Sequence, residues 1–202
     1  MDASTGIWQY GHDLLNLFYP ETCAACGATL LRNEKVLCLH CLVEMPLTGF
    51  HRNPDNEVAR LFWGRIPFKM ASSFLFFTRG SRYRNILHEL KYRGREEAGL
   101  VLGKMYGNAL KDSDIATADF IHPVPLHPAR FRQRGYNQSA LIAEGMSEAL
   151  GVPLVTDLIS RRVDSLTQTR RHRYERWENV RHIFRCEKPD RLVNRHIVLV
   201  DD

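Results

Sequence analysis

Two pairs of cysteines limit what the first part of this chain can fold into more than any other feature. Cys23 and Cys26 are separated by two residues, as are Cys38 and Cys41, and eleven residues lie between the pairs. A tight turn lets the two thiolates of each pair face one ion, and two pairs complete the tetrahedral four-sulfur shell that suits Zn²⁺. Gly27 adds the backbone freedom that such turns use. The spacing predicts a structural zinc site in a compact hairpin.

Other chemistries use the same residues. A redox dithiol shares the Cys-x-x-Cys spacing, although two pairs at this distance argue against it. An iron–sulfur cluster also takes four thiolates, and this alternative stays open. His40 stands beside Cys41 and is an available substitute ligand. Cys186 stands alone, and we expect an ordinary, partly buried thiol there. Four protein ligands leave no open position for a substrate, so the site is expected to be structural.

Charge and hydropathy narrow the setting. A net charge of +5 over 202 residues favours an anionic partner, such as a phosphate, a nucleotide, a nucleic acid or an acidic protein surface. No run of about 18 apolar residues occurs, so we expect no membrane span. The first residues, Met1–Thr5, lack the basic start of a secretory signal. The expected location is the cytoplasm, where cysteines stay reduced.

Predicted helices and strands alternate along the rest of the chain. The apolar spacing predicts helices at 5–18, 57–63, 83–92, 96–110 and 137–150, and strands at 71–78, 120–125, 153–159 and 197–200. Such alternation predicts an α/β fold with a parallel sheet built from strand–helix–strand units. We expect two regions: residues 1–66 hold an N-terminal helix, the zinc module and a linker, and residues 67–202 form the α/β domain.

The last predicted strand ends in two acids. Asp201 and Asp202 directly follow the apolar run Ile197–Val200. Open α/β sheets bind ligands at the carboxyl ends of their strands. Two carboxylates there can accept hydrogen bonds from a ribose diol or hold Mg²⁺ through water. The alternative is a strand followed by an ordinary polar turn.

Several motifs together resemble a known family. They run through nearly the whole chain: the four-cysteine module, Leu90–Gly94, Pro123–His127 with Arg130 and Arg132, Arg134–Gln138, Arg161, Thr167–Gln168, Arg176, Asn179 and Val198–Asp202. This set resembles the ComF family, also described as ComF/GntX-like or amidophosphoribosyltransferase-like proteins. The string Arg-Gly-Tyr-Asn-Gln at Arg134–Gln138 is its most specific part, and the terminal strand is less specific.

The resemblance implies a type I phosphoribosyltransferase-like fold, a parallel sheet flanked by helices. Enzymes of that type bind phosphoribosyl pyrophosphate (PRPP) with Mg²⁺. By resemblance, Asp201 and Asp202 are the catalytic acid pair that faces the ribose hydroxyls. The Pro123–His127 turn, with Pro125 and His127, corresponds to the pyrophosphate-side loop. The segment Arg161–Arg176 is similar to the mobile loop that closes over the site.

Three arginines extend this expected phosphate site. Arg130, Arg132 and Arg134 have no acidic neighbour between Pro123 and Gln138. Guanidinium groups match the geometry of phosphate oxygens, so we expect these arginines to bind the phosphates of PRPP. The alternative is a solvated basic face.

One departure from the family pattern concerns the end of the sequence. In the family a short Thr/Gly-rich loop follows the acid pair and cradles the 5′-phosphate, whereas this sequence ends at Asp202. We therefore expect a truncated chain that binds PRPP poorly, because the ligand loses the donors that orient it. Binding of Mg²⁺ with PRPP is expected of a full-length form.

Two basic segments contain aromatic residues as well. Lys91, Tyr92 and Arg93 form one candidate group for nucleic-acid binding, and Arg170, Arg171 and Arg173 form the other. Arginine and aromatic side chains can follow a phosphate backbone and stack bases. ComF-like proteins are associated with uptake of single-stranded DNA during natural transformation, so the resemblance implies single-stranded DNA or DNA-processing proteins as partners. The alternative is that these arginines serve the PRPP site and ion pairs.

Two functions follow from these patterns. The first is a competence accessory protein of single-stranded DNA uptake or processing, built on a PRPP-binding type of fold. The alternative is a phosphoribosyltransferase that displaces pyrophosphate from PRPP with a nitrogen nucleophile. We find no dedicated base for such a transfer. We also find no glutamine-hydrolysing cysteine, because four of the cysteines are assigned to the metal. This favours the first function.

Overall fold

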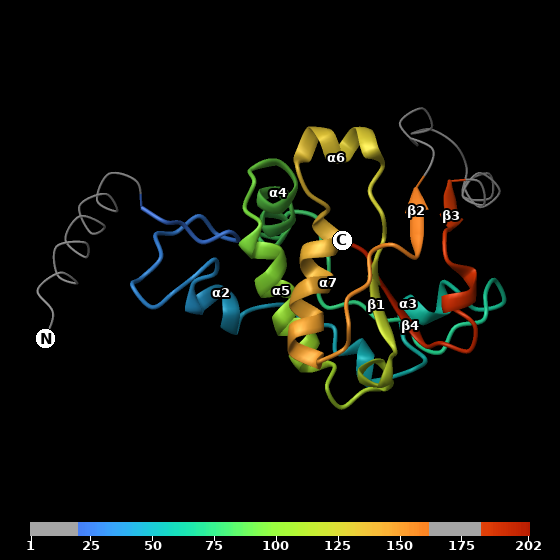
Figure 1. The fold of residues 1–202 in the computed structure, drawn as a ribbon. Helices are drawn as coiled ribbons and strands as arrows, with labels where there is room; N and C mark the ends of the chain where they lie inside the picture. The colour runs from blue at the N-terminus through green and yellow to red at the C-terminus, as the bar shows by residue number, and fades with distance from the viewer. Residues whose placement is uncertain (1–19, 162–182) are drawn as a thin grey trace, which may run out of the picture. The chain divides into compact units, whose positions relative to one another are not determined.

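The computed structural model describes residues 20–161 and 183–202 (Figure 1). Its helices are α2 (Leu39–Val43), α3 (Glu57–Arg60), α4 (Arg84–Tyr92), α5 (Glu97–Ala109), α6 (Pro128–Arg134) and α7 (Gln138–Leu150). Its strands are β1 (Phe120–Pro123), β2 (Ile159–Arg161), β3 (Phe184–Cys186) and β4 (Ile197–Val200), and short 3-10 turns lie at Phe50–Arg52, Asp114–Thr117 and Pro189–Arg191. Within the described residues, no helix is long and apolar enough to cross a membrane.

Contacts divide the chain into two compact units. The first unit combines the chain up to Pro46 with Phe77–Ile86, and the second combines Leu47–Phe76 with Leu87–Asp202. The first holds the four cysteines, and the second holds all four strands. The segment 47–66, which the sequence assigns to the N-terminal region, therefore makes its contacts with the α/β unit.

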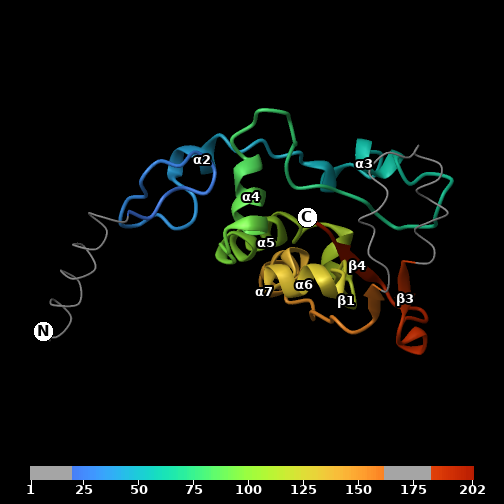
Figure 2. The same cartoon turned by 90° about the horizontal axis from the view of Figure 1, so that it is seen from above.

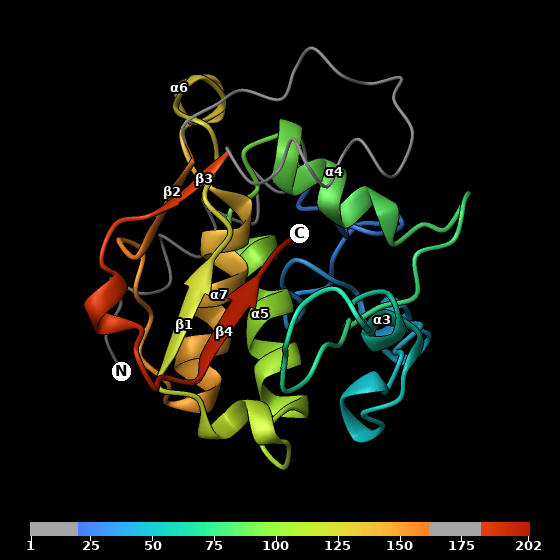
Figure 3. The same cartoon turned by 90° about the vertical axis from the view of Figure 1, so that its right-hand side faces the viewer.

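A small parallel sheet forms the centre of the second unit. β1 and β4 pair in parallel, from Phe120 opposite Ile197 to Pro123 opposite Val200. On the other edge of β1, Leu154 forms a single parallel bridge to Ile121. Figure 3 shows β1 and β4 side by side, with α7 and α5 behind them. The predicted mixed helix-and-strand class with a parallel sheet is confirmed, and its assignment as a phosphoribosyltransferase fold stays a prediction.

Two predicted strands take a different form. In the predicted strand 153–159 only Leu154 pairs with β1, because the chain then turns into β2, which pairs with β3 in antiparallel fashion. Figure 2 shows β2 and β3 on the opposite side of β1 and β4 from α5 and α7. The predicted strand 71–78 makes one antiparallel bridge, from Leu75 to Leu47, and Phe77 is 61% exposed. Among residues 20–161 and 183–202 this segment makes no ladder with a second strand, so it does not form a regular strand there.

The helices α5 and α7 pack with their backbones in contact. α5 has glycine at every fourth position, Gly99, Gly103 and Gly107, which places them on one face of the helix. A Cβ at Gly99 would lie 2.8 Å from Leu141 Cβ, and a Cβ at Gly103 would overlap the backbone of Ile142. The missing side chains allow this close approach of the two helices.

α7 matches the helix predicted at 137–150 to within one residue, and both of its ends are capped. Asn137 accepts a hydrogen bond from the Ser139 N–H at 3.2 Å and caps the start of the helix. Gly151, with φ of 71°, ends it in the left-handed conformation. Buried apolar side chains from α4, α5, α7, β1 and β4 form the core of this unit, among them Leu90, Ile121, Ala143, Met146 and Val200. The predicted helix 5–18 lies outside the described residues.

Candidate functional site

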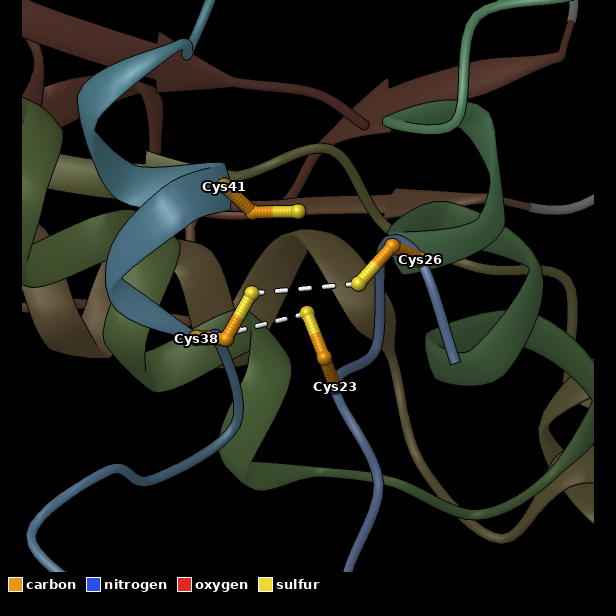
Figure 4. A group of neighbouring side chains, drawn as sticks. All are labelled: Cys23, Cys26, Cys38 and Cys41. Carbon is orange, nitrogen blue, oxygen red and sulfur yellow. Dashed lines mark hydrogen bonds between the residues drawn. The ribbon is translucent and has the colours of Figure 1, made fainter. Parts of the chain in front are cut away.

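The four cysteine sulfur atoms converge on one centre. Cys23 and Cys26 lie on a tight turn, Cys38 precedes α2, and Cys41 lies within α2 (Figure 4). All four Sγ atoms lie within 4.8 Å of one another, and those of Cys26 and Cys38 are 3.8 Å apart. Bonds of about 2.3 Å to a tetrahedral zinc ion put sulfur atoms about 3.8 Å apart. The set could therefore bind a metal ion such as zinc.

Backbone hydrogen bonds hold the turns in this shape. Gly27, with φ of 76°, donates its N–H to the Cys23 carbonyl at 2.9 Å. The Cys38 N–H points at Cys23 Sγ, 3.4 Å away. Burial opposes ionisation of Cys23, but backbone N–H groups of Cys26, Cys38 and Ala25 outweigh it and lower its pKa to about 7. N–H donors directed at a thiolate are what a metal-bound sulfur needs.

Residues between and beyond the cysteine pairs brace the first unit. Both carboxylate oxygens of Glu34 accept backbone N–H bonds at 2.7 Å, from Leu31 and Leu39, which tightens the loop between the pairs. Tyr83 donates its hydroxyl to the Cys41 carbonyl at 3.0 Å, and Asn85 donates to the Ala25 carbonyl at 2.8 Å. The sequence reading missed these contacts, because nothing in the pattern of residues 77–86 points back to the cysteines.

The other thiol and the neighbouring histidine lie outside the cluster. Cys186 is exposed on β3, so the prediction of a partly buried thiol is wrong. His40 faces Glu44, with 3.4 Å between His40 Nε2 and the carboxylate. The four sulfurs also form one group rather than two separate dithiols. This arrangement favours a metal over redox chemistry, and it leaves zinc and iron as alternatives.

The two terminal acids lie beside the bend that follows β1. Val124 donates its N–H to the Val200 carbonyl at 2.8 Å, one residue before the acids. Asp201 accepts a hydrogen bond from Ser139 Oγ at 3.2 Å, and Asp202 pairs with Lys91 Nζ at 3.0 Å. The acids thus meet the start of α7 and the end of α4 at the carboxyl edge of the sheet. Their predicted roles toward ribose and Mg²⁺ stay predictions.

The three arginines of the predicted phosphate site lie on the short helix α6. His127 Nδ1 accepts the Ala129 N–H at 3.2 Å and caps this helix. Arg130 and Arg134 are one turn apart and lie on the same side of α6, whereas Arg132 lies on another and is exposed. Pro125 lies in the bend before the helix.

The Arg-Gly-Tyr-Asn-Gln string serves largely as a structural connection. Tyr136 donates its hydroxyl to the Leu90 carbonyl, and Asn137 Nδ2 donates to the Val124 carbonyl at 2.9 Å. Arg134 donates to Gln138 Oε1 at 2.8 Å. The string fixes α6, α7 and the bend after β1 relative to the end of α4. Two of its side chains, Arg134 and Tyr136, also line a hollow.

A hollow of about 200 Å³ opens between the ends of α4 and α6. Its lining comprises Lys91, Tyr92, Gly94, Gln133, Arg134 and Tyr136. The structure therefore brings together two predicted nucleic-acid residues, Lys91 and Tyr92, and one predicted phosphate residue, Arg134. Arg93 lies apart from this lining and pairs with Glu89 at 3.3 Å.

Most of the second basic segment lies outside the described residues. Arg170, Arg171 and Arg173 lie outside the described residues, as does most of the predicted closing loop Arg161–Arg176. The nucleic-acid role expected of these arginines stays a prediction.

His122 is a buried histidine that the sequence analysis does not single out. His122 lies in the middle of β1 and is fully buried, and its Nε2 accepts the Ile159 N–H at 3.2 Å. Burial lowers the pKa of His122, so the ring is neutral near pH 7. Its place in an apolar strand gives no sign of this contact, which joins β1 to the start of β2.

Comparisons with known proteins reveal relatives for part of the chain. It is 31% identical over 121 residues to "DNA utilization protein YhgH" of Escherichia coli O157:H7, which is 58% of this chain and 52% of that protein. It is 25% identical over 122 residues to "Competence protein F" of Haemophilus influenzae, covering 58% of this chain and 53% of the relative. The chain thus spans about half the length of the curated relatives it matches.

The other comparisons add no relative. No family model matches the chain, and no solved structure matches it significantly. The predicted relationship to competence-type proteins is supported by these two matches. The phosphoribosyltransferase character is not tested by them and stays a prediction.

Proposed function

We propose that this chain handles single-stranded DNA, as an accessory protein of competence or DNA utilisation. The observation that carries this proposal is the similarity over 121 and 122 residues to proteins named "DNA utilization protein YhgH" and "Competence protein F". A net charge of +5 supports it, because a basic protein attracts the phosphate backbone. So do the cationic and aromatic side chains Lys91, Tyr92 and Arg134 around one hollow.

Zinc is our assignment for the four-cysteine group, in a structural role. Sulfur separations near those of a tetrahedral site support it, as do the N–H groups directed at Cys23. Bound there, the ion would supply folding energy to a unit with few apolar residues in its core, and it would leave no position for a substrate.

The carboxyl edge of the sheet is our candidate for a PRPP-type site. Asp201 and Asp202 would accept hydrogen bonds from a ribose diol or hold Mg²⁺ through water. Pro125, His127, Arg130, Arg132 and Arg134 would face the phosphates. The short distance between the acids and the bend after β1 supports this, since it lets one ligand reach both.

The same observation favours a second candidate function, phosphoribosyl transfer from PRPP. In that reaction the acids would orient the ribose, and arginines would balance the charge of the leaving pyrophosphate. The described residues around the acids supply a serine and a lysine but no free general base: Ser139 is bound to Asp201, and Lys91 is paired with Asp202. We therefore rank transfer second.

Filter binding of a labelled single strand tests the first function. Binding should weaken steeply between about 50 and 200 mM salt, because each released counterion adds to the slope. A double strand of equal length serves as the control for general charge attraction. Equal affinity for both, or no retention of the single strand at the lower salt, would contradict the proposal. Pyrophosphate release from PRPP in the presence of Mg²⁺, abolished by Asp201→Asn, would instead support the transferase.

A further inference from the structure

The hollow between α4 and α6 combines features that suit one nucleotide. Its side chains offer two tyrosine rings, a guanidinium group and an ammonium group, and none of its six lining residues is acidic. At about 200 Å³ it is smaller than the pockets that enclose whole drug-sized ligands, which hold about 300–1,000 Å³. A hollow of this size and charge fits one planar base with its phosphate.

Tyr92 and Arg134 form a cation–π pair at this hollow. The Arg134 guanidinium carbon lies 5.5 Å from the centroid of the Tyr92 ring, and the Tyr92 side chain is 67% exposed. The hydrogen bond from Arg134 to Gln138 holds the guanidinium in place, since Gln138 is 1% exposed. Nucleobases stack on aromatic rings and on arginine planes in single-strand sites. The pair is therefore a ready surface for a base.

Lys91 has the positive charge to bind a phosphate, but it already forms an ion pair with Asp202. Its Nζ lies 3.0 Å from the carboxylate of Asp202, and the two side chains are 27% and 18% exposed. A carboxylate and a phosphate oxygen are similar hydrogen-bond acceptors for an ammonium group. Asp202 thus occupies Lys91 in the free protein, and a nucleotide phosphate must compete with it.

We propose that this hollow is a nucleotide subsite for single-stranded DNA: one base stacks on the Tyr92–Arg134 pair, and its phosphate takes Lys91 from Asp202. The subsite rests on the proposed function and makes it specific. Stacking tolerates any base, so the subsite binds without sequence preference. Release of Asp202 links strand binding to the acid pair at the end of β4, because the carboxylate is freed when the strand binds.

The stacking half of the proposal is tested with a fluorescent single strand of about 12 nucleotides that contains 2-aminopurine. Tyr92→Ala should weaken binding about tenfold or more, because loss of one base–aromatic stack has about that effect. Tyr92→Phe keeps the ring and should stay within about twofold of the native affinity. Trp63→Ala removes another exposed aromatic ring, 53% exposed and outside this lining, and is the matched control.

The outcomes of that series are distinct. A loss with Tyr92→Ala alone, and recovery with Tyr92→Phe, supports the subsite. Equal losses with Tyr92→Ala and Trp63→Ala, or no loss with either, overturn it. Thermal unfolding of each variant shows that the fold is retained, which we expect because the Tyr92 side chain is exposed.

The competition half is tested with two variants of opposite expected effect. Lys91→Met should weaken strand binding and lower the salt slope by about 0.7, as expected for one lost phosphate contact. Asp202→Asn frees Lys91 and should strengthen binding, by up to about fivefold for a partly exposed ion pair. Weaker binding by Asp202→Asn than by the native protein would overturn the competition.

Failure of the subsite and failure of the proposed function can be told apart. If substitution of Tyr92 and Lys91 leaves the affinity for the single strand unchanged, the proposed DNA function stands and the subsite is overturned. No binding of the strand, together with Tyr92-dependent binding of a trinucleotide, keeps the subsite and removes the DNA function. No binding of either ligand overturns both.

Discussion

The N–H of Val124 donates to the carbonyl of Val200 at 2.8 Å, and this bond extends the pairing of β1 and β4 to the point where both strands end. The bend after β1 and the acids after β4 therefore lie at one edge of the sheet. The hydrogen bond from Asn137 Nδ2 to the Val124 carbonyl joins the start of α7 to that edge, and α5 packs closely on α7. Each of these supports leads to a prediction.

Removal of one zinc ligand should unfold the first unit. Cys38→Ser leaves three thiolates, and structural zinc sites contribute about 10–16 kcal/mol of binding energy to folding. Elemental analysis should find about one zinc per native chain. It should find almost none in the variant, and limited proteolysis should then cut within residues 20–46. Cys186→Ser, which removes an exposed thiol outside the cluster, is the control. A native protein that is folded and metal-free would refute the zinc site.

The contact between α5 and α7 predicts a strong effect of one methyl group. Gly103→Ala puts a Cβ into the backbone of Ile142, and overpacking of this kind costs about 1–3 kcal/mol. The loss should exceed the gain of about 1 kcal/mol that alanine brings to an unobstructed helix position. Chemical denaturation of the variant measures the difference. Lys104→Ala, at a half-exposed position of the same helix, should change stability little. Stabilisation by Gly103→Ala would contradict the observed helix separation.

Asn137 has two separable roles, and two substitutions should divide them. Asn137→Ala removes the cap of α7 and the bond to the Val124 carbonyl, for a loss of about 2 kcal/mol in unfolding free energy. Asn137→Ser retains a capping oxygen but not the amide donor, so about half of the loss should remain. Asn108→Ala, which removes an exposed amide bonded to its own helix, is the control. Equal effects of all three would show that Asn137 has no special role.

Protonation of Asp119 in acid should lower the stability of the protein at the start of β1 and β4. The His196 N–H first, and then the Arg195 guanidinium, hold the pKa of Asp119 below its usual value. A lowered folded-state pKa gives stability above the unfolded value of about 3.9, and that stability is lost as pH falls through the folded value.

Thermal unfolding across pH tests this contribution. Native protein should lose more stability between about pH 6 and 3 than Asp119→Asn, which cannot ionise. Glu57→Gln, at an exposed acid on α3 in the same unit, should behave as the native protein does. Parallel curves for native protein and Asp119→Asn would contradict the assignment.

The sequence predicts elements better than it predicts their partners. The spacing of the cysteines, the helical periodicity over 137–150 and the apolar run Ile197–Val200 are local signals, and the structure contains each feature close to the expected residues. The predicted strand at 71–78 is wrong, because its apolar residues say nothing about the absence of a second strand to pair with. Strand pairing depends on distant residues, whereas capping and turns do not.

The candidate site shows the same limit. Sequence reasoning named Lys91 and Tyr92 for nucleic acid and Arg134 for phosphate, on separate grounds. Their common hollow depends on how α4 and α6 meet, which no local pattern encodes. The ion pair between Lys91 and Asp202 joins residues more than a hundred positions apart, and no local sequence pattern predicts it.

Photo-crosslinking tests the central claim, that single-stranded DNA binds at the edge of the sheet beside α4 and α6. A strand that carries 4-thiothymidine is bound, irradiated and digested with protease, and the attached peptides are identified by mass spectrometry. The account predicts crosslinks to the peptide that holds Lys91 and Tyr92, and their loss in the presence of excess unlabelled strand. Crosslinks confined to the cysteine module, or spread evenly over the basic surface, would contradict it.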